Sequence, residues 1–88
     1  MNPTRARQAI RKLAGQDRFR VTAYSAHRML TRGVARREVR AVLLFSEECR
    51  AQENGRWLLR DESLTVIAEI RTDAIVVTVY RGDEDGDE

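Results

Sequence analysis

The sequence predicts a single α+β domain in which helices pack on one face of a small antiparallel sheet. In the first half, apolar residues recur three or four positions apart, as they do on one side of a helix. After Ser46 the spacing changes to the alternation that is typical of strands. Glycines punctuate both halves. The expected order is therefore helix, short strand, two helices, and then three or four strands.

The composition is that of a small globular domain. The chain has 88 residues, of which 42% are hydrophobic and 34% charged, and this is enough for one modest core. It has no run of about 20 apolar residues and no signal-peptide pattern, so we expect no membrane partner and a cytoplasmic location. Cys49 is the only cysteine, which excludes an internal disulfide.

Three helices are expected before Ser46. Asn2 and Pro3 form a typical helix start, and the first helix extends to about Ala14. The second extends from about Ala23 to Arg32 and the third from about Ala35 to Phe45. The residues expected to face inward are Ala6, Ala9, Ile10 and Leu13 in the first helix, Ala26, Met29 and Leu30 in the second, and Val39, Val42 and Leu43 in the third.

The strands are predicted from alternation, β-branched residues and turn residues. Asn54-Gly55 is the strongest hairpin signal of the chain. The expected strands are Arg18–Thr22, a weak one near Arg50–Gln52, then Arg56–Arg60, Leu64–Arg71 and Ala74–Arg81. These strands supply the sheet on which the helices pack.

A register follows if the last two turns, Glu62-Ser63 and Thr72-Asp73, contain two residues each. The expected pairs are Trp57 with Ala68, Leu59 with Val66, Val66 with Val79, Ala68 with Val77, and Ile70 with Ile75. The core face then carries Trp57, Leu59, Val66, Ala68, Ile70, Ile75, Val77 and Val79. The opposite face carries Arg56, Leu58, Arg60, Thr65, Ile67, Glu69, Val76, Thr78 and Tyr80. It is either a candidate anion site or an ordinary solvated sheet surface.

The charge is unevenly distributed along the chain. Residues 1–40 carry eleven Arg and Lys against two acids, residues 41–82 carry five Arg against seven acids, and residues 83–88 carry five acids. A basic N-terminal half indicates an anionic partner, and nucleic acid is favoured over a membrane because no amphipathic aromatic stripe is present. We expect residues 1–82 to form the domain. Residues 83–88 are expected to be a disordered acidic tail that solubilises the protein or shields a basic site.

The segment YSAHRMLTRGVARREV, residues 24–39, contains the only histidine. On a helix, Tyr24, Arg28 and Arg32 form one stripe with His27 on its flank. An imidazole can transfer a proton near neutral pH, and arginines can stabilise the charge of a phosphodiester transition state. The pattern permits metal-independent phosphodiester cleavage. Structural or solvated roles for these residues explain the same spacing.

A DNA-binding helix-turn-helix is the second interpretation of this segment. The glycine and valine at 33 and 34 suit a tight turn between helices, and Arg36, Arg37 and Arg40 then lie on the second helix. The sheet that follows directly is unusual for this motif. Other chemistry is not indicated, because a single His and a single Cys make no usual zinc site and no glycine-rich phosphate loop occurs, so we expect no metal and no cofactor.

The segment VTAYSAHRMLTRGVARREVRAVL and the final IVVTVYR resemble domain-of-unknown-function family number 4258, over roughly residues 19–81. The matching positions are Thr22, the pair Arg28-Met29, the triplet Arg32-Gly33-Val34, and Thr78 and Tyr80 near the end. That family is related to the RelE-like and barnase-like nuclease fold. The resemblance therefore implies a toxin that cleaves RNA without a metal, with its active site on or beside the sheet face opposite the helices.

One position departs from the family pattern. Tyr24 stands where the family has a histidine, and His27 follows three residues later. The resemblance leaves three alternatives: His27 substitutes from the neighbouring position, Tyr24 acts as a weaker acid or base, or the site is inactive.

The predicted function is a metal-independent endoribonuclease of the toxin–antitoxin type, with RNA as substrate and a protein antitoxin as partner. His27 is the candidate acid or base, with Tyr24 as its substitute. Arg28, Arg32 and Arg60 are expected to stabilise phosphate, and Thr78 and Tyr80 to orient the substrate. The residues expected to bind nucleic acid are Arg36, Arg37, Arg40, Arg56 and Arg60. The alternatives are a non-catalytic nucleic-acid-binding module and a protein-interaction module of the same fold.

Overall fold

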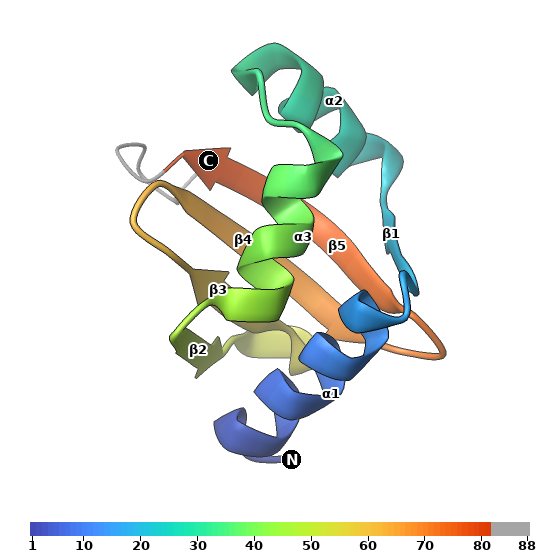
Figure 1. Ribbon diagram of the computed structural model, residues 1–88, viewed down its shortest axis with the longest axis vertical. Helices are drawn as coiled ribbons and strands as arrows, with labels where there is room; N and C mark the ends of the chain where they lie inside the picture. Colours follow the sequence, from blue (N-terminus) through green and yellow to red (C-terminus); the bar gives the residue numbers. More distant parts are fainter. Residues whose placement is uncertain (82–88) are drawn as a thin grey trace.

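Three helices and a five-stranded sheet make up the computed structural model, which describes residues 1–81 (Figure 1). The elements are α1 (Pro3–Gly15), β1 (Phe19–Val21), α2 (Ala23–Arg32), α3 (Arg36–Phe45), β2 (Glu48–Ala51), the 3-10 turn η1 (Glu53–Gly55), β3 (Trp57–Arg60), β4 (Leu64–Ile70) and β5 (Ala74–Arg81). The α+β class and the predicted element order are confirmed. The predicted acidic tail, residues 83–88, lies outside the described residues.

The strand order of the sheet is β1-β5-β4-β3-β2. Strands β2 to β5 form the expected antiparallel meander, whereas β1 pairs in parallel with β5, with Arg20 opposite Ile75. The prediction of an entirely antiparallel sheet is therefore wrong at this edge. The chain enters β1 from α1 rather than through a hairpin with its neighbour, so an antiparallel direction is not imposed on it.

The main core lies between the sheet and the helices α1 and α3, which cover one of its faces (Figure 1). Side chains such as Ile10 and Leu43 pack against Leu59, Val66 and Val79, all of which are fully buried. The inward residues predicted for the third helix are confirmed, because Val39, Val42 and Leu43 are buried there.

The side of helix α2 that is buried differs from the predicted side. Ala26 is exposed and Leu30 is 81% exposed, whereas Ser25, Arg28 and Met29 are buried. Of the three predicted inward residues in this helix, only Met29 reaches the main core. The spacing of apolar residues did not predict the buried side of α2, because two polar side chains, Ser25 and Arg28, are buried there and form hydrogen bonds.

These two side chains complete the hydrogen bonding of the β5 edge. Strand β1 pairs with β5 only as far as Val76, and α2 covers the edge beyond it. Ser25 Oγ donates to the Val76 carbonyl at 2.7 Å, and Arg28 Nε donates to the Val79 carbonyl at 3.1 Å. The Val76 carbonyl also accepts a hydrogen bond from Thr22 N at 3.0 Å, so Ser25 adds a second donor there. Farther along β5, beyond the end of β1, Arg28 supplies the donor that a neighbouring strand would otherwise give to a buried carbonyl.

The predicted register is correct over the first part of the β4–β5 pair and wrong over the second. Val66 pairs with Val79 as expected, and the pairs of β3 with β4 also agree. However, Ile70 pairs with Ala74 rather than Ile75, because the last turn contains three residues, 71–73, instead of two.

A β-bulge at Val77 shifts the register by one residue between the two parts of the β4–β5 pair. Ala68 pairs with Val76 and Ile67 with Thr78, so Val77 has no partner of its own. As a result, Ala74 and Val76 occupy the core in place of the predicted Ile75 and Val77. Val77 joins Thr78 on the opposite face, where both line the same hollow.

Candidate functional site

The sheet face turned away from α1 and α3, hereafter the open face, is the far side of the sheet in Figure 1. Leu58, Ile67 and Tyr80 form a second, small apolar cluster there, with Val77 packed against it. Next to this cluster is a hollow of about 450 Å³. Its lining combines apolar and polar side chains, and includes Thr22, Tyr24, Arg56, Ile67, Thr78 and Tyr80.

Four residues predicted from the sequence thus meet at one place: Tyr24, Arg56, Thr78 and Tyr80. Tyr24 lies in the first turn of α2, whose start is fixed by Thr22 because the Thr22 hydroxyl accepts a hydrogen bond from Ser25 N at 3.1 Å. Thr78 and Tyr80 come from β5. The hollow therefore lies between the start of α2 and strands β4 and β5.

Arg56 is held at the hollow by a carboxylate on the neighbouring strand. Its Nε donates to Glu69 Oε2 at 2.8 Å, and Glu69 also pairs with Arg71 at 3.2 Å. The hydrogen bond from Arg56, aided by Arg71, holds the pKa of Glu69 below its usual range although partial desolvation opposes the shift. Glu69 is therefore ionised at neutral pH and keeps Arg56 in a defined position.

Arg28 lies beside the hollow but has a structural contact of its own. Only 9% of it is exposed, and its guanidinium carbon is 5.8 Å from the centre of the Tyr24 ring. With Nε bonded to Val79, the group places a positive charge close to Tyr24 while it completes the β5 edge.

His27 and Arg32 are both exposed on α2 and are not among the residues that line the hollow. His27 therefore does not meet Tyr24, Thr78 and Tyr80 in this arrangement, although it lies one turn from Tyr24 along the helix. At the end of the same helix, Arg81 donates to the carbonyls of Arg32 and Gly33 at 3.3 and 2.8 Å.

Arg60 is separated from the other predicted residues. Its Nε donates to Thr65 Oγ1 at 3.1 Å, and the residue lines another hollow together with Phe45 and several acids, Glu47, Glu48, Asp61 and Glu62. These carboxylates make that surface unsuited to phosphate.

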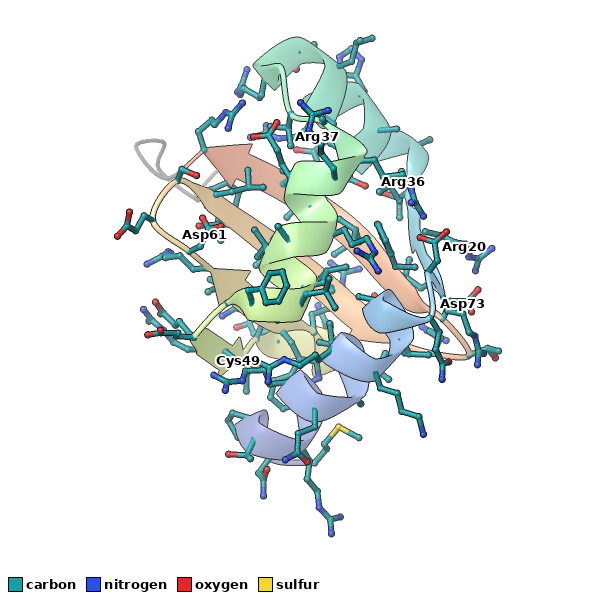
Figure 2. The ribbon with its side chains drawn as sticks, in the orientation of Figure 1. Arg20, Arg36, Arg37, Cys49, Asp61 and Asp73 are labelled. Atoms are coloured by element: carbon teal, nitrogen blue, oxygen red, sulfur yellow. The ribbon has the colours of Figure 1, made fainter. Side chains whose placement is uncertain are left out.

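Arg36, Arg37 and Arg40 belong to α3, on the side of the sheet that the helices cover; Figure 2 labels the first two. Arg36 pairs with Asp17 at 3.1 Å and lies over the Phe19 ring at 4.0 Å. Arg40 Nε donates to the Ala14 carbonyl at 3.2 Å, whereas Arg37 is exposed. Two of the three arginines thus connect α3 to the end of α1 and to β1. Their contacts within the fold do not favour α3 as a helix that contacts DNA bases.

The sequence did not indicate Gln52 or Val77 as residues of the site. It indicated Thr22 only as a position that matches the family pattern, and Ile67 only as a residue of the sheet face opposite the core. Gln52 could have been found from its position two residues before the Asn54-Gly55 turn. Val77 could not, because the bulge that turns it to the open face depends on whether the preceding turn, residues 71–73, contains two residues or three.

The described residues contain no group of three or more His, Cys, Asp or Glu side chains that could hold a metal ion. Among residues 1–81, no helix is long and apolar enough to span a bilayer.

Comparison with known proteins gives no match: neither a protein-family model, a curated protein nor a solved structure is significantly similar to this chain. The resemblance to the RelE-like nucleases accordingly stays a prediction.

Proposed function

We propose that this protein binds RNA on its open face and cleaves it without a metal ion. The observation that supports the proposal is the hollow in which Tyr24 and Arg56 lie with Thr78 and Tyr80. A fixed guanidinium is well suited to a phosphate, and phenol and alcohol hydroxyls can donate to phosphate oxygens or transfer a proton.

The chemistry that fits this set is attack by the RNA itself. The 2′-hydroxyl oxygen bonds to the adjacent phosphorus, the bond from phosphorus to the 5′-oxygen breaks, and a 2′,3′-cyclic phosphate and a 5′-hydroxyl result. Solvent water takes the proton that leaves the 2′-hydroxyl, and a phenol hydroxyl in the hollow gives a proton to the departing 5′-oxygen and regains one from water. Arg56 stabilises the negative charge that develops on the phosphoryl oxygens, since it lines the hollow and is fixed by Glu69.

In this proposal Tyr24 is the acid–base group. It lies in the hollow, 54% exposed, with the positive charge of Arg28 beside its ring, whereas His27 is outside the hollow. Thr78 and Tyr80 position the phosphate. The same proposal includes a cytoplasmic location and a protein antitoxin that covers the open face.

The test uses a single-stranded RNA oligomer in excess EDTA, with products separated on a denaturing gel. We expect the wild type to cleave the RNA and leave the 2′-deoxy oligomer of the same sequence intact, because DNA lacks the nucleophile. Tyr24→Phe should reduce the rate by about 10²–10⁴-fold. Arg56→Ala should reduce it by about 10²–10³-fold.

Two matched variants act as controls. Arg11→Ala removes an exposed arginine of α1 and should leave the rate unchanged, as should His27→Ala. Loss of cleavage in His27→Ala alone would move the acid–base role to His27. RNA that is bound but not cleaved would favour the non-catalytic binding module, and RNA that is neither bound nor cleaved would refute the proposal.

A further inference from the structure

A second hollow adjoins the first on the open face. It has a volume of about 650 Å³ and lies at the β2–β3 hairpin, where its lining includes Gln52, Glu53 and Asn54. The two hollows share Gln52, Arg56, Ile67 and Thr78. Together they form one groove that extends from Tyr24 at α2 to Asn54 at the tip of the hairpin.

The chemical character changes along this groove. Tyr24 offers a half-exposed aromatic ring at one end, and Arg56 offers a cation in the middle. At the other end the polar groups are the amides of Gln52 and Asn54 and the carboxylate of Glu53, and Arg56 is the only cation that lines this hollow. A phosphate suits the middle of the groove, whereas the hairpin end suits the hydrogen-bonding edge of a base.

The hairpin presents its three side chains from a defined turn. Gln52 N donates to the Arg56 carbonyl at 2.8 Å, and Arg56 N donates to the Glu53 carbonyl at 3.4 Å. Asn54 and Gly55 have φ values of 63° and 73°, in the left-handed region that these two residue types tolerate. Arg56 closes this turn and lines both hollows, so the position of the phosphate and that of the base are coupled.

We infer that Gln52, Glu53 and Asn54 form a base-binding subsite, so that the nucleosides on either side of the phosphate at Arg56 lie against Tyr24 and against the hairpin. This inference rests on the proposed RNA-binding function. The ligand is single-stranded RNA, because the base edges of a duplex are already paired. A carboxylate only accepts hydrogen bonds. An exocyclic amino group offers it two N–H donors, whereas the single N3–H donor of uracil lies between two carbonyl oxygens that repel a carboxylate, so Glu53 favours a base with an amino group over uracil.

The experiment measures binding separately from cleavage. Fluorescence anisotropy gives the dissociation constants of 2′-O-methyl hexamers, which lack the nucleophile: hexauridylate, and hexauridylate with one cytidine at a central position. We expect the wild type to bind the cytidine oligomer about tenfold more tightly, as one or two additional hydrogen bonds would give. An RNA hairpin in which this cytidine is base-paired should not bind more tightly than hexauridylate.

Three variants probe the subsite without a risk to the fold, because all three residues are exposed. They are Gln52→Ala, Glu53→Ala and Asn54→Gly, the last chosen because glycine accepts the φ of 63°. Glu53→Ala should reduce the cytidine preference to less than twofold. Glu62→Ala, which removes an exposed carboxylate from the β3–β4 turn, controls for the change in net charge and should keep the preference.

The outcomes separate this inference from the proposed function. Equal affinity of the wild type for both oligomers, or a preference that survives all three hairpin variants, would overturn the subsite while RNA binding stands. Absence of binding to either oligomer would overturn the RNA-binding function, and the subsite with it.

Discussion

Arg28 was selected from the sequence as a catalytic residue, but in the structure it has a structural role. The stripe formed with Tyr24 and Arg32 suggested phosphate chemistry, yet the Arg28 guanidinium is buried and bonded to the Val79 carbonyl. Its removal therefore changes the fold as well as the charge near Tyr24. For this reason Tyr24 and Arg56 are the better residues with which to test cleavage.

We expect Arg28→Ala to lower the free energy of unfolding by about 2 kcal/mol, because it removes a buried charge-assisted hydrogen bond and leaves a carbonyl without a donor. Urea denaturation followed by circular dichroism measures this change. Arg11→Ala, on the exposed side of α1, should shift the value by no more than about 0.5 kcal/mol. Equal stability of the two variants would mean that the β5 edge does not depend on Arg28.

The position of some site residues could be predicted from local sequence signals, whereas that of others depends on contacts between elements. Tyr24 and Thr78 could be predicted because one follows a helix start and the other lies in a clear strand. That His27 lies outside the hollow could not, because it depends on the rotation of α2, which is set by the contacts of Ser25 and Arg28 with β5.

At the scale of elements, the bounds of helices and strands were predicted to within one residue, except that β2 begins two residues earlier than expected. Periodicity and turn residues carry this information locally. The β4–β5 register was only half right, because a turn of three residues and a bulge at Val77 compensate for each other. Neither feature leaves a local signal in the sequence.

The ion pair of Glu69 with Arg56 links β4 to the start of β3 and should make stability depend on pH. The lowered pKa of Glu69 means that its contribution is complete above the unfolded-state value of about 4.3 and is lost as the pH falls through the lower folded-state value. We expect Glu69→Gln to flatten the decline of unfolding free energy below that pH. Urea titrations between about pH 2.5 and 7 measure it, and an unchanged slope would contradict this expectation.

At the scale of the whole molecule, the basic residues lie on different sides. Arg36 and Arg37 are on the helix-covered side (Figure 2), whereas Arg56 lines the groove of the open face. The net charge alone predicted an anionic partner but could not distinguish these two surfaces. Arg36 and Arg40 donate hydrogen bonds to backbone carbonyls within the fold, so the open face is the better candidate for the surface that binds the proposed anionic partner.

If the protein binds RNA as proposed, the five acids of residues 83–88 lower the net positive charge of the chain that attracts it. We expect a chain ending at residue 82 to bind RNA more tightly than the full chain at low salt, and the difference to shrink as salt screens the charges. Anisotropy titrations with a 2′-O-methyl oligomer at about 20 and 200 mM salt measure this effect. Equal affinities at low salt would exclude it.

The contacts between α2 and β5 also bear on how the protein behaves in concentrated solution. An uncovered strand edge can recruit another chain and start aggregation. Of the described strands, β1 is only three residues long, β2 carries the Glu48–Arg50 ion pair, and the remaining edge of β5 is closed by Ser25 and Arg28. Detachment of α2 alone would expose that edge, so loss of solubility should precede complete unfolding on heating.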